Sequence, residues 1–68
     1  MTVKIDDFYH CTRSHPMGAM FFTEGKSYQV VDFDEDGDAI LITDQNTKSP
    51  AGVPLGGVIW DFVHEPQE

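Results

Sequence analysis

Apolar and polar residues alternate with a period of two over several short segments of this chain, and Gly, Pro, Asn or Asp residues separate those segments. A period of two is typical of β-strands, because successive side chains of a strand point to opposite faces of its sheet. Nothing of helical length interrupts the pattern, apart from a single possible turn at residues 55–58. The sequence therefore predicts an all-β protein of five short strands, closed into a small and strongly bent barrel.

The alternation also predicts which side chains share a face of each strand. In the first expected strand, residues 8–12, Tyr9 and Cys11 share one face. In the strand that follows the tight turn at residues 23–26, Tyr28 and Val30 share a face. The remaining clear strand segments lie at residues 39–43 and around residues 59–63. A long first loop, residues 13–20, holds Pro16, which removes a donor from any strand ladder.

The whole chain, residues 1–68, is predicted to form one domain, since 68 residues cannot supply two cores. Hydrophobic residues make up 40% of it and aromatic residues 12%, which is too much for a disordered segment. Cys11 is the single cysteine and cannot form an internal disulfide. No secretory leader or membrane-spanning run is recognisable, so we expect a cytoplasmic protein.

The charge balance restricts the class of partner. Twelve acidic side chains face four basic ones, and the formal net charge is -8. Surfaces that bind nucleic acid or anionic membranes need clustered Lys and Arg, whereas the basic residues here are scattered along the chain. We therefore expect neither direct nucleic-acid binding nor membrane binding. A basic partner, or solubility alone, accounts for the charge.

The order of strands, turns and acidic tip resembles Src-homology-3-like (SH3-like) barrels, and more narrowly the small SH3-like proteins of bacteriophages and prophages. The resemblance spans residues 8–65 and rests on Tyr9, Cys11, Phe22, Gly25, Lys26, Tyr28, Val30, Asp36, Gly37 and Asp38. It implies a five-stranded SH3-like barrel with a long first loop and an acidic β-hairpin tip, and residence in the cytoplasm of a host cell. The sequences RSHPMGAM and AILIT replace the groove motifs of signalling SH3 domains, so recognition of proline-rich peptides is not implied.

The acidic tip itself, DFDEDGD at residues 32–38, allows three interpretations. Asp32, Asp34 and Asp36 match the first three carboxylate positions of an EF-hand calcium loop, and Gly37 matches its glycine. The last ligand position falls on Thr43, which cannot supply two carboxylate oxygens, and the flanking segments predict strands in place of helices. The sequence therefore does not favour a calcium site.

The second interpretation is a solvent-exposed hairpin, because Asp36-Gly37 between two alternating runs is typical of a type I′ turn. That turn would place Glu35 opposite Asp38. The third is an acidic ribbon that imitates nucleic acid and inhibits a host DNA- or RNA-binding enzyme. Its surface would consist of Asp32, Asp34, Glu35, Asp36 and Asp38.

Few residues suggest catalysis or metal binding. His10, Cys11, His15 and His64 have the chemistry of zinc ligands, but their spacing fits no common zinc module, and His10 and Cys11 point to opposite faces of one strand. Cys11 is expected to be buried, which disfavours a thiol nucleophile. No glycine-rich phosphate loop is present. We expect no enzyme activity, no catalytic residue, no metal and no cofactor.

The apolar residues of the first loop and the last strand favour an interaction surface. Met17 and Met20 are flexible side chains suited to an adaptable partner, and one of Phe21 and Phe22 is expected to enter the core. The last strand is apolar on both faces, so Ile59 and Val63 would need cover from a partner or a second copy. The sequence thus predicts a non-enzymatic protein-binding module, monomeric or weakly homo-oligomeric. Its predicted binding residues are Met17, Met20, Phe21, Tyr28 and Trp60.

Overall fold

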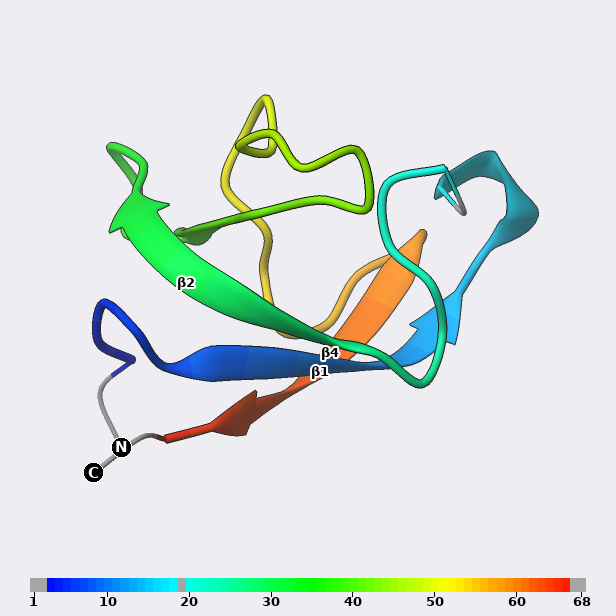
Figure 1. Ribbon diagram of the computed structural model, residues 1–68, viewed down its shortest axis with the longest axis horizontal. Coiled ribbons are helices and arrows are strands. Elements are labelled where there is room, and N and C mark those ends of the chain that lie inside the picture. The colour runs from blue at the N-terminus through cyan, green and yellow to red at the C-terminus, as the bar shows by residue number, and fades with distance from the viewer. Residues whose placement is uncertain (1–2, 19, 67–68) are drawn as a thin grey trace.

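The computed structural model describes residues 3–18 and 20–66 and contains one antiparallel sheet (Figure 1). Its elements, in chain order, are β1 (Phe8–Ser14), a short 3-10 helix η1 (Pro16–Gly18), β2 (Ser27–Phe33), β3 (Ala39–Leu41) and β4 (Trp60–Glu65). No α-helix occurs in the described residues. The prediction of an all-β protein is confirmed. Within the same residues, no helix is long and apolar enough to cross a membrane.

The sheet has the strand order β3-β2-β1-β4, so β1 lies between β2 and the last strand. Phe8 at the start of β1 is opposite Gln29 of β2 and Glu65 of β4. The register shifts between Cys11 and Arg13 in the β1–β4 ladder, and again in the β2–β3 ladder. Such irregularities bend a strand and increase its twist, which curls this sheet into a half-barrel.

The expectation of five strands is not confirmed, because the sheet formed by the described residues contains four. The chain between β3 and β4 makes only isolated bridges, which join Ala39 to Val53, Ile42 to Lys48 and Gly56 to Asp61. Pro50 and Pro54 in this segment have no N–H group to donate to a ladder. Residues 55–58 contain no helical turn, and the turn of helix in the described residues lies at η1 instead.

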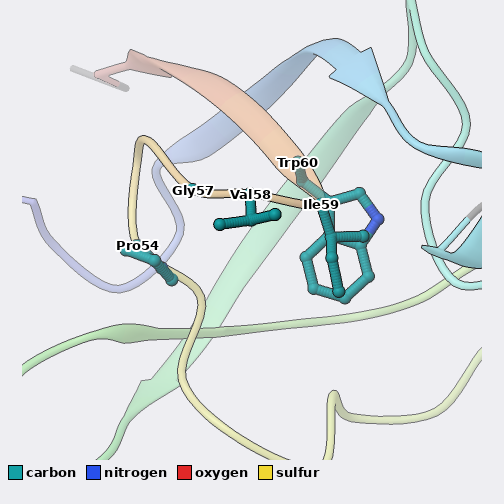
Figure 2. A pocket seen from close by; sticks show the side chains of 5 residues that line it. All are labelled: Pro54, Gly57, Val58, Ile59 and Trp60. Carbon is teal, nitrogen blue, oxygen red and sulfur yellow. The ribbon is translucent and has the colours of Figure 1, made fainter.

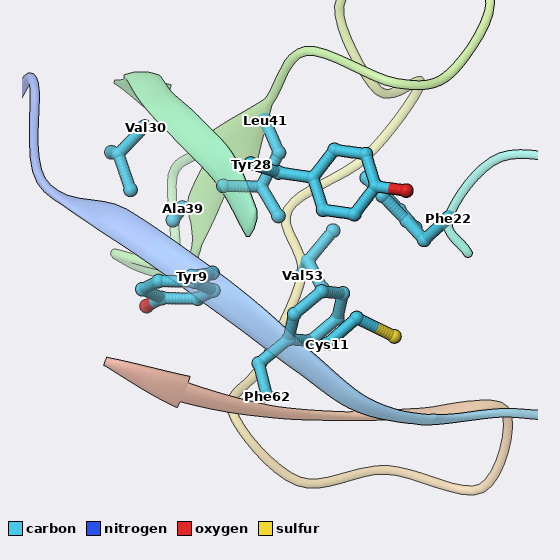
Figure 3. Packing of buried hydrophobic residues seen from close by; sticks show 9 residues of the cluster. All are labelled: Tyr9, Cys11, Phe22, Tyr28, Val30, Ala39, Leu41, Val53 and Phe62. Atoms are coloured by element: carbon cyan, nitrogen blue, oxygen red, sulfur yellow. The ribbon is translucent and has the colours of Figure 1, made fainter. Parts of the chain in front are cut away.

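The side chains predicted to share a face of β1 and of β2 are buried together, and alternate residues of β3 join them in the core. Tyr9 and Cys11 of β1, Tyr28 and Val30 of β2, and Ala39 and Leu41 of β3 are all buried. Figure 3 shows these side chains directed toward one another and joined by Phe22, Val53 and Phe62. Phe22 is the phenylalanine of its pair that enters the core, at 1% exposure. Its ring packs edge-on against three aromatic rings, with centroids at 4.8 Å for Tyr28, 5.0 Å for Trp60 and 5.3 Å for Phe62.

The acidic hairpin has a different turn from the type I′ turn expected. Gly37 has a φ of 85°, whereas Asp36 is not among the residues with positive φ, and a type I′ turn needs positive φ at both positions. Asp34 N donates to Asp38 O at 2.9 Å, and Gly37 N donates to Asp34 O at 3.1 Å. This is a three-residue loop in which Gly37 takes the left-handed conformation. Asp34, and not Glu35, is therefore the cross-strand partner of Asp38.

The Asp34 carboxylate explains this choice of turn. Its Oδ1 atom accepts backbone N–H groups from Asp36 at 3.0 Å and from Asp38 at 2.9 Å. An aspartate that bonds its own downstream backbone stabilises a tight turn in this way. One of the five acidic residues of the tip thus holds the hairpin in shape.

Residues 3–7 form an N-terminal strap across the sheet. Asp6 N donates to Val30 O at 2.9 Å, and Val30 N donates to Asp7 O at 2.8 Å. Asp7 is only 3% exposed, and its Oδ2 atom accepts the backbone N–H of Lys4 at 2.9 Å. The strap is therefore hydrogen-bonded to β2, and it carries a buried carboxylate, that of Asp7, which contacts His64 of β4.

Candidate interaction surface

The indole of Trp60, at the start of β4, is held in one position by its neighbours. Its Nε1 atom donates to the carbonyl oxygen of Gly18 at 3.2 Å. The ring packs edge-on against Phe22 and, with centroids 6.4 Å apart, against Phe21. A β-carbon at Gly18 would overlap both Ile59 and the indole, so this close approach of η1 requires glycine. The Trp60 ring is therefore fixed in place and can form one wall of a surface hollow.

Two apolar hollows lie against this wall. The first has a volume of about 200 Å³ and is lined by Pro54, Gly57, Val58, Ile59 and Trp60 (Figure 2). The second has a volume of about 100 Å³ and is lined by Phe21, Phe22, Ser49, Pro50, Ala51, Gly52, Val53 and Trp60. Trp60 lines both hollows. We call this region the Trp60 surface, defined by Phe21, Pro50, Pro54, Val58 and Trp60.

Val58 projects from the Trp60 surface with 88% of its area exposed. Its backbone is nevertheless anchored, because Arg13 donates from Nη2 to Gly57 O at 2.9 Å and to Val58 O at 3.4 Å. Arg13 Nε also pairs with Asp61 Oδ2 at 2.7 Å. This hydrogen bond, with a second from Gly57 N, lowers the pKa of Asp61. The valine is thus presented to solvent by a restrained loop.

Two of the predicted binding residues, Phe21 and Trp60, line the same hollow. Met17 and Met20 are 76% and 61% exposed, but neither lines either of these hollows. Tyr28 requires a correction, because it is buried at 6% exposure and cannot present its ring to a partner. Its hydroxyl is also occupied inside the protein, since it donates to Asp44 Oδ1 at 2.8 Å and accepts from Thr23 N at 2.6 Å.

Sequence reasoning missed Pro50, Pro54 and Val58 as lining residues. Pro54 and Val58 lie in VPLGGVIW, for which only a possible turn at residues 55–58 and the start of a strand were predicted. The available signal was Val58 itself, an apolar residue placed directly after two glycines. Glycine-rich turns expose the residues beside them, so an apolar side chain at this position is a candidate for a surface contact.

The acidic residues of the hairpin are unequal in exposure. Asp32, Glu35 and Asp36 are exposed, whereas Asp34 and Asp38 are half-buried at its base. A β-carbon at Gly52 would overlap the Asp34 carboxylate and the Asp38 side chain, so the base of the hairpin packs directly on Gly52. Figure 1 shows the hairpin tip and η1 at opposite ends of the 30 Å long axis. The acidic tip and η1, which contains Met17, therefore lie on separate surfaces.

The residues with metal-binding or nucleophilic chemistry are dispersed. His10 Nδ1 contacts Ser27 Oγ at 3.0 Å, His15 Nδ1 accepts the backbone N–H of Met17 at 3.1 Å, and His64 contacts Asp7. The part of the chain that the structure describes contains no group of three His, Cys, Asp or Glu side chains able to hold a metal ion. Cys11 is fully buried, and burial raises the pKa of its thiol.

Comparison of the chain with protein-family models, with curated proteins and with solved structures gave no match.

Proposed function

We propose that this protein is a non-enzymatic interaction module that binds another protein through the Trp60 surface. The observation that carries the proposal is one immobilised indole that lines two apolar hollows, together with an almost fully exposed valine that lines the first. Tryptophan is enriched among residues that dominate binding energy, and such residues sit in pockets flanked by apolar contacts. Exposed apolar side chains gathered around such a residue favour a protein-binding site.

The rigidity of the Trp60 surface supports the same proposal. Ordering loose side chains on binding costs about 0.5–1.5 kcal/mol each, and a side chain already held in place avoids much of this cost. The Nε1 bond to Gly18 and the Arg13 bonds to the loop at Gly57 supply that order before a partner arrives. Met17 and Met20 would extend the contact with adaptable side chains.

An SH3-like identity and a phage or prophage origin, with residence in the host cytoplasm, belong to this proposal. They are supported by the sequence pattern from Tyr9 to Asp38 and by the curled antiparallel sheet. Partner binding by a monomer fits the net charge of -8, which opposes self-association.

The experiment compares two exposed valines. Val58 is part of the Trp60 surface, whereas Val63, 54% exposed, lines neither hollow. We expect wild type and Val63→Asp to capture the same protein from bacterial lysate and Val58→Asp to lose it, with unchanged thermal unfolding for all three. Loss with Val63→Asp and retention with Val58→Asp would contradict the proposal.

The second candidate function is inhibition of a DNA- or RNA-binding enzyme by the acidic hairpin. It is favoured by the fixed backbone of the hairpin, which presents Asp32, Glu35 and Asp36 to solvent. Its test is a Glu35→Lys/Asp36→Lys variant, measured at low and high salt. Asp34 is left intact, because reversing its charge would remove the two hydrogen bonds that shape the turn. A captured enzyme lost with this variant and in salt would support the acidic hairpin.

A further inference from the structure

We propose that the occupant of the Trp60 surface is an extended segment of a partner protein, with apolar side chains in the hollows and a Lys or Arg at the end that passes Gly52. This inference rests on the proposed function and adds the chemistry and the direction of the bound segment.

The second hollow lies beside carboxylates. Phe21, Trp60 and Gly52 all line it, and the base of the acidic hairpin packs on Gly52. The Oδ1 atom of Asp34 makes the two hydrogen bonds of the turn, and Oδ2 is the carboxylate oxygen nearest to Gly52. A chain that follows this hollow past Gly52 therefore meets negative charge immediately after its apolar contacts.

The opposite end of the surface offers less charge. Asp61, whose Oδ1 atom accepts the N–H of Gly57 in the first hollow, already pairs with Arg13 at 2.7 Å. Asp44, bonded through its backbone to Phe21, has a carboxylate that accepts the hydroxyls of Thr23 and Tyr28, with Lys26 Nζ 3.9 Å away. Unbalanced negative charge is thus concentrated at the Gly52 end. A bound segment is oriented by this asymmetry, with its cation toward the hairpin.

The size of the hollows favours side chains of a polypeptide over a small ligand. Volumes of about 100 and 200 Å³ fall below the range of about 300–1,000 Å³ typical of small-molecule sites. A second copy of this chain is disfavoured as occupant, because it would bring a charge of -8 toward a charge of -8. A nucleic acid would meet the same repulsion. A polypeptide segment with apolar side chains and a cation fits both the small volume of the hollows and the negative charge of the protein.

The test starts from short random peptides displayed on phage and selected on the whole protein. We expect the enriched peptides to share an apolar core flanked on one side by Lys or Arg. The binding constant of one enriched synthetic peptide is then measured by fluorescence anisotropy against matched charge variants. Asp34→Asn/Asp38→Asn removes two charges beside Gly52, and the amide oxygen that it introduces at position 34 can still accept the turn hydrogen bonds. Asp32→Asn/Asp36→Asn removes two charges from the exposed parts of the hairpin.

We expect the variant at the hairpin base to weaken binding about tenfold, and the control variant less than about twofold, at low salt. Thermal unfolding of both variants establishes that they remain folded. Enriched peptides without cations, or equal losses from both variants, would overturn the inference. If those peptides still lost affinity with Val58→Asp, the proposed function would stand without it. Selection of no peptide that depends on Val58 would overturn both.

Discussion

His64 Nε2 lies 2.7 Å from Asp7 Oδ2, which joins two residues 57 positions apart. The two side chains are 12% and 4% exposed, so the contact is shielded from solvent. The same Asp7 oxygen accepts the backbone N–H of Lys4. The buried carboxylate therefore fastens the N-terminal strap to the edge strand of the sheet.

Removal of the His64 side chain is expected to destabilise the protein by about 1.5–3 kcal/mol, because a buried carboxylate loses a partner. His64→Ala and the control His10→Ala are compared by urea unfolding. The His10 contact to Ser27 is solvent-exposed, so we expect the control to change stability by less than about 0.5 kcal/mol. Equal stability of the two variants would show that the strap does not depend on this contact.

Gly18→Ala is expected to lower the free energy of unfolding by about 1–3 kcal/mol. The new β-carbon would overlap Ile59 and the Trp60 indole, so both side chains would have to move away from residue 18. The displacement of the indole should also change the emission spectrum of Trp60, the single tryptophan. Gly56→Ala is the control, because its β-carbon would meet nothing closer than 3.9 Å. An unchanged spectrum for Gly18→Ala would contradict the close packing described here.

Phe22→Ala and Phe21→Ala should have very different effects although the residues are adjacent. Phe22 is 1% exposed and contacts three aromatic rings, so its truncation is expected to cost about 3–5 kcal/mol. Phe21 is only partly buried, so its truncation should destabilise the protein less. The same truncation should weaken partner binding. Similar losses of stability in thermal unfolding would mean that both rings belong to the core.

Stability is expected to fall in alkali because burial raises the pKa of Tyr9 and of Tyr28 above the ordinary value of 10.0. The nearby carboxylates of Asp38 and Asp7 raise the pKa of Tyr9 further. Unfolded tyrosines ionise first, so this contribution to stability is complete below about pH 10 and is lost as the pH rises through the raised folded values. Melting temperatures measured from about pH 8 to 11 check this, and Tyr28→Phe should flatten the decline. If the melting temperature of Tyr28→Phe fell with pH as steeply as that of wild type, groups other than Tyr28 would be responsible for the decline.

The inward-facing residues were predictable because they obey a local rule. In β1, β2 and β3 a period of two decides which side chains share the buried face, and Tyr9, Val30 and Leu41 follow it. The exact turn at Asp34 was not predictable from Asp36-Gly37, because a side-chain hydrogen bond selected a longer loop. Pattern alone also could not show that the Tyr28 hydroxyl is satisfied inside the protein, since its partner Asp44 lies 16 positions away.

Only Phe21 and Trp60 of the Trp60 surface were predicted from the sequence, because the surface depends on contacts between distant segments. Phe21 and Trp60 are far apart in the chain, and each was recognised as a large apolar residue without a settled place in the core. Their common hollow exists because Gly18 admits the indole and the chain around Pro50 closes the other side. Such a juxtaposition depends on tertiary packing and is not encoded in any local period.

The central position of β1 sets the order in which the protein can fold. Its first residue, Phe8, must find Glu65 at the far end of β4 as well as Gln29 of β2. On a ribosome, the β1–β2 pair can form while the rest of the chain is still being made, but β1 waits for its second neighbour until β4 has emerged. Pairing across such a sequence separation is intrinsically slow. Until it forms, one edge of β1 and the apolar face that Phe62 covers are open to chaperones and to other nascent chains.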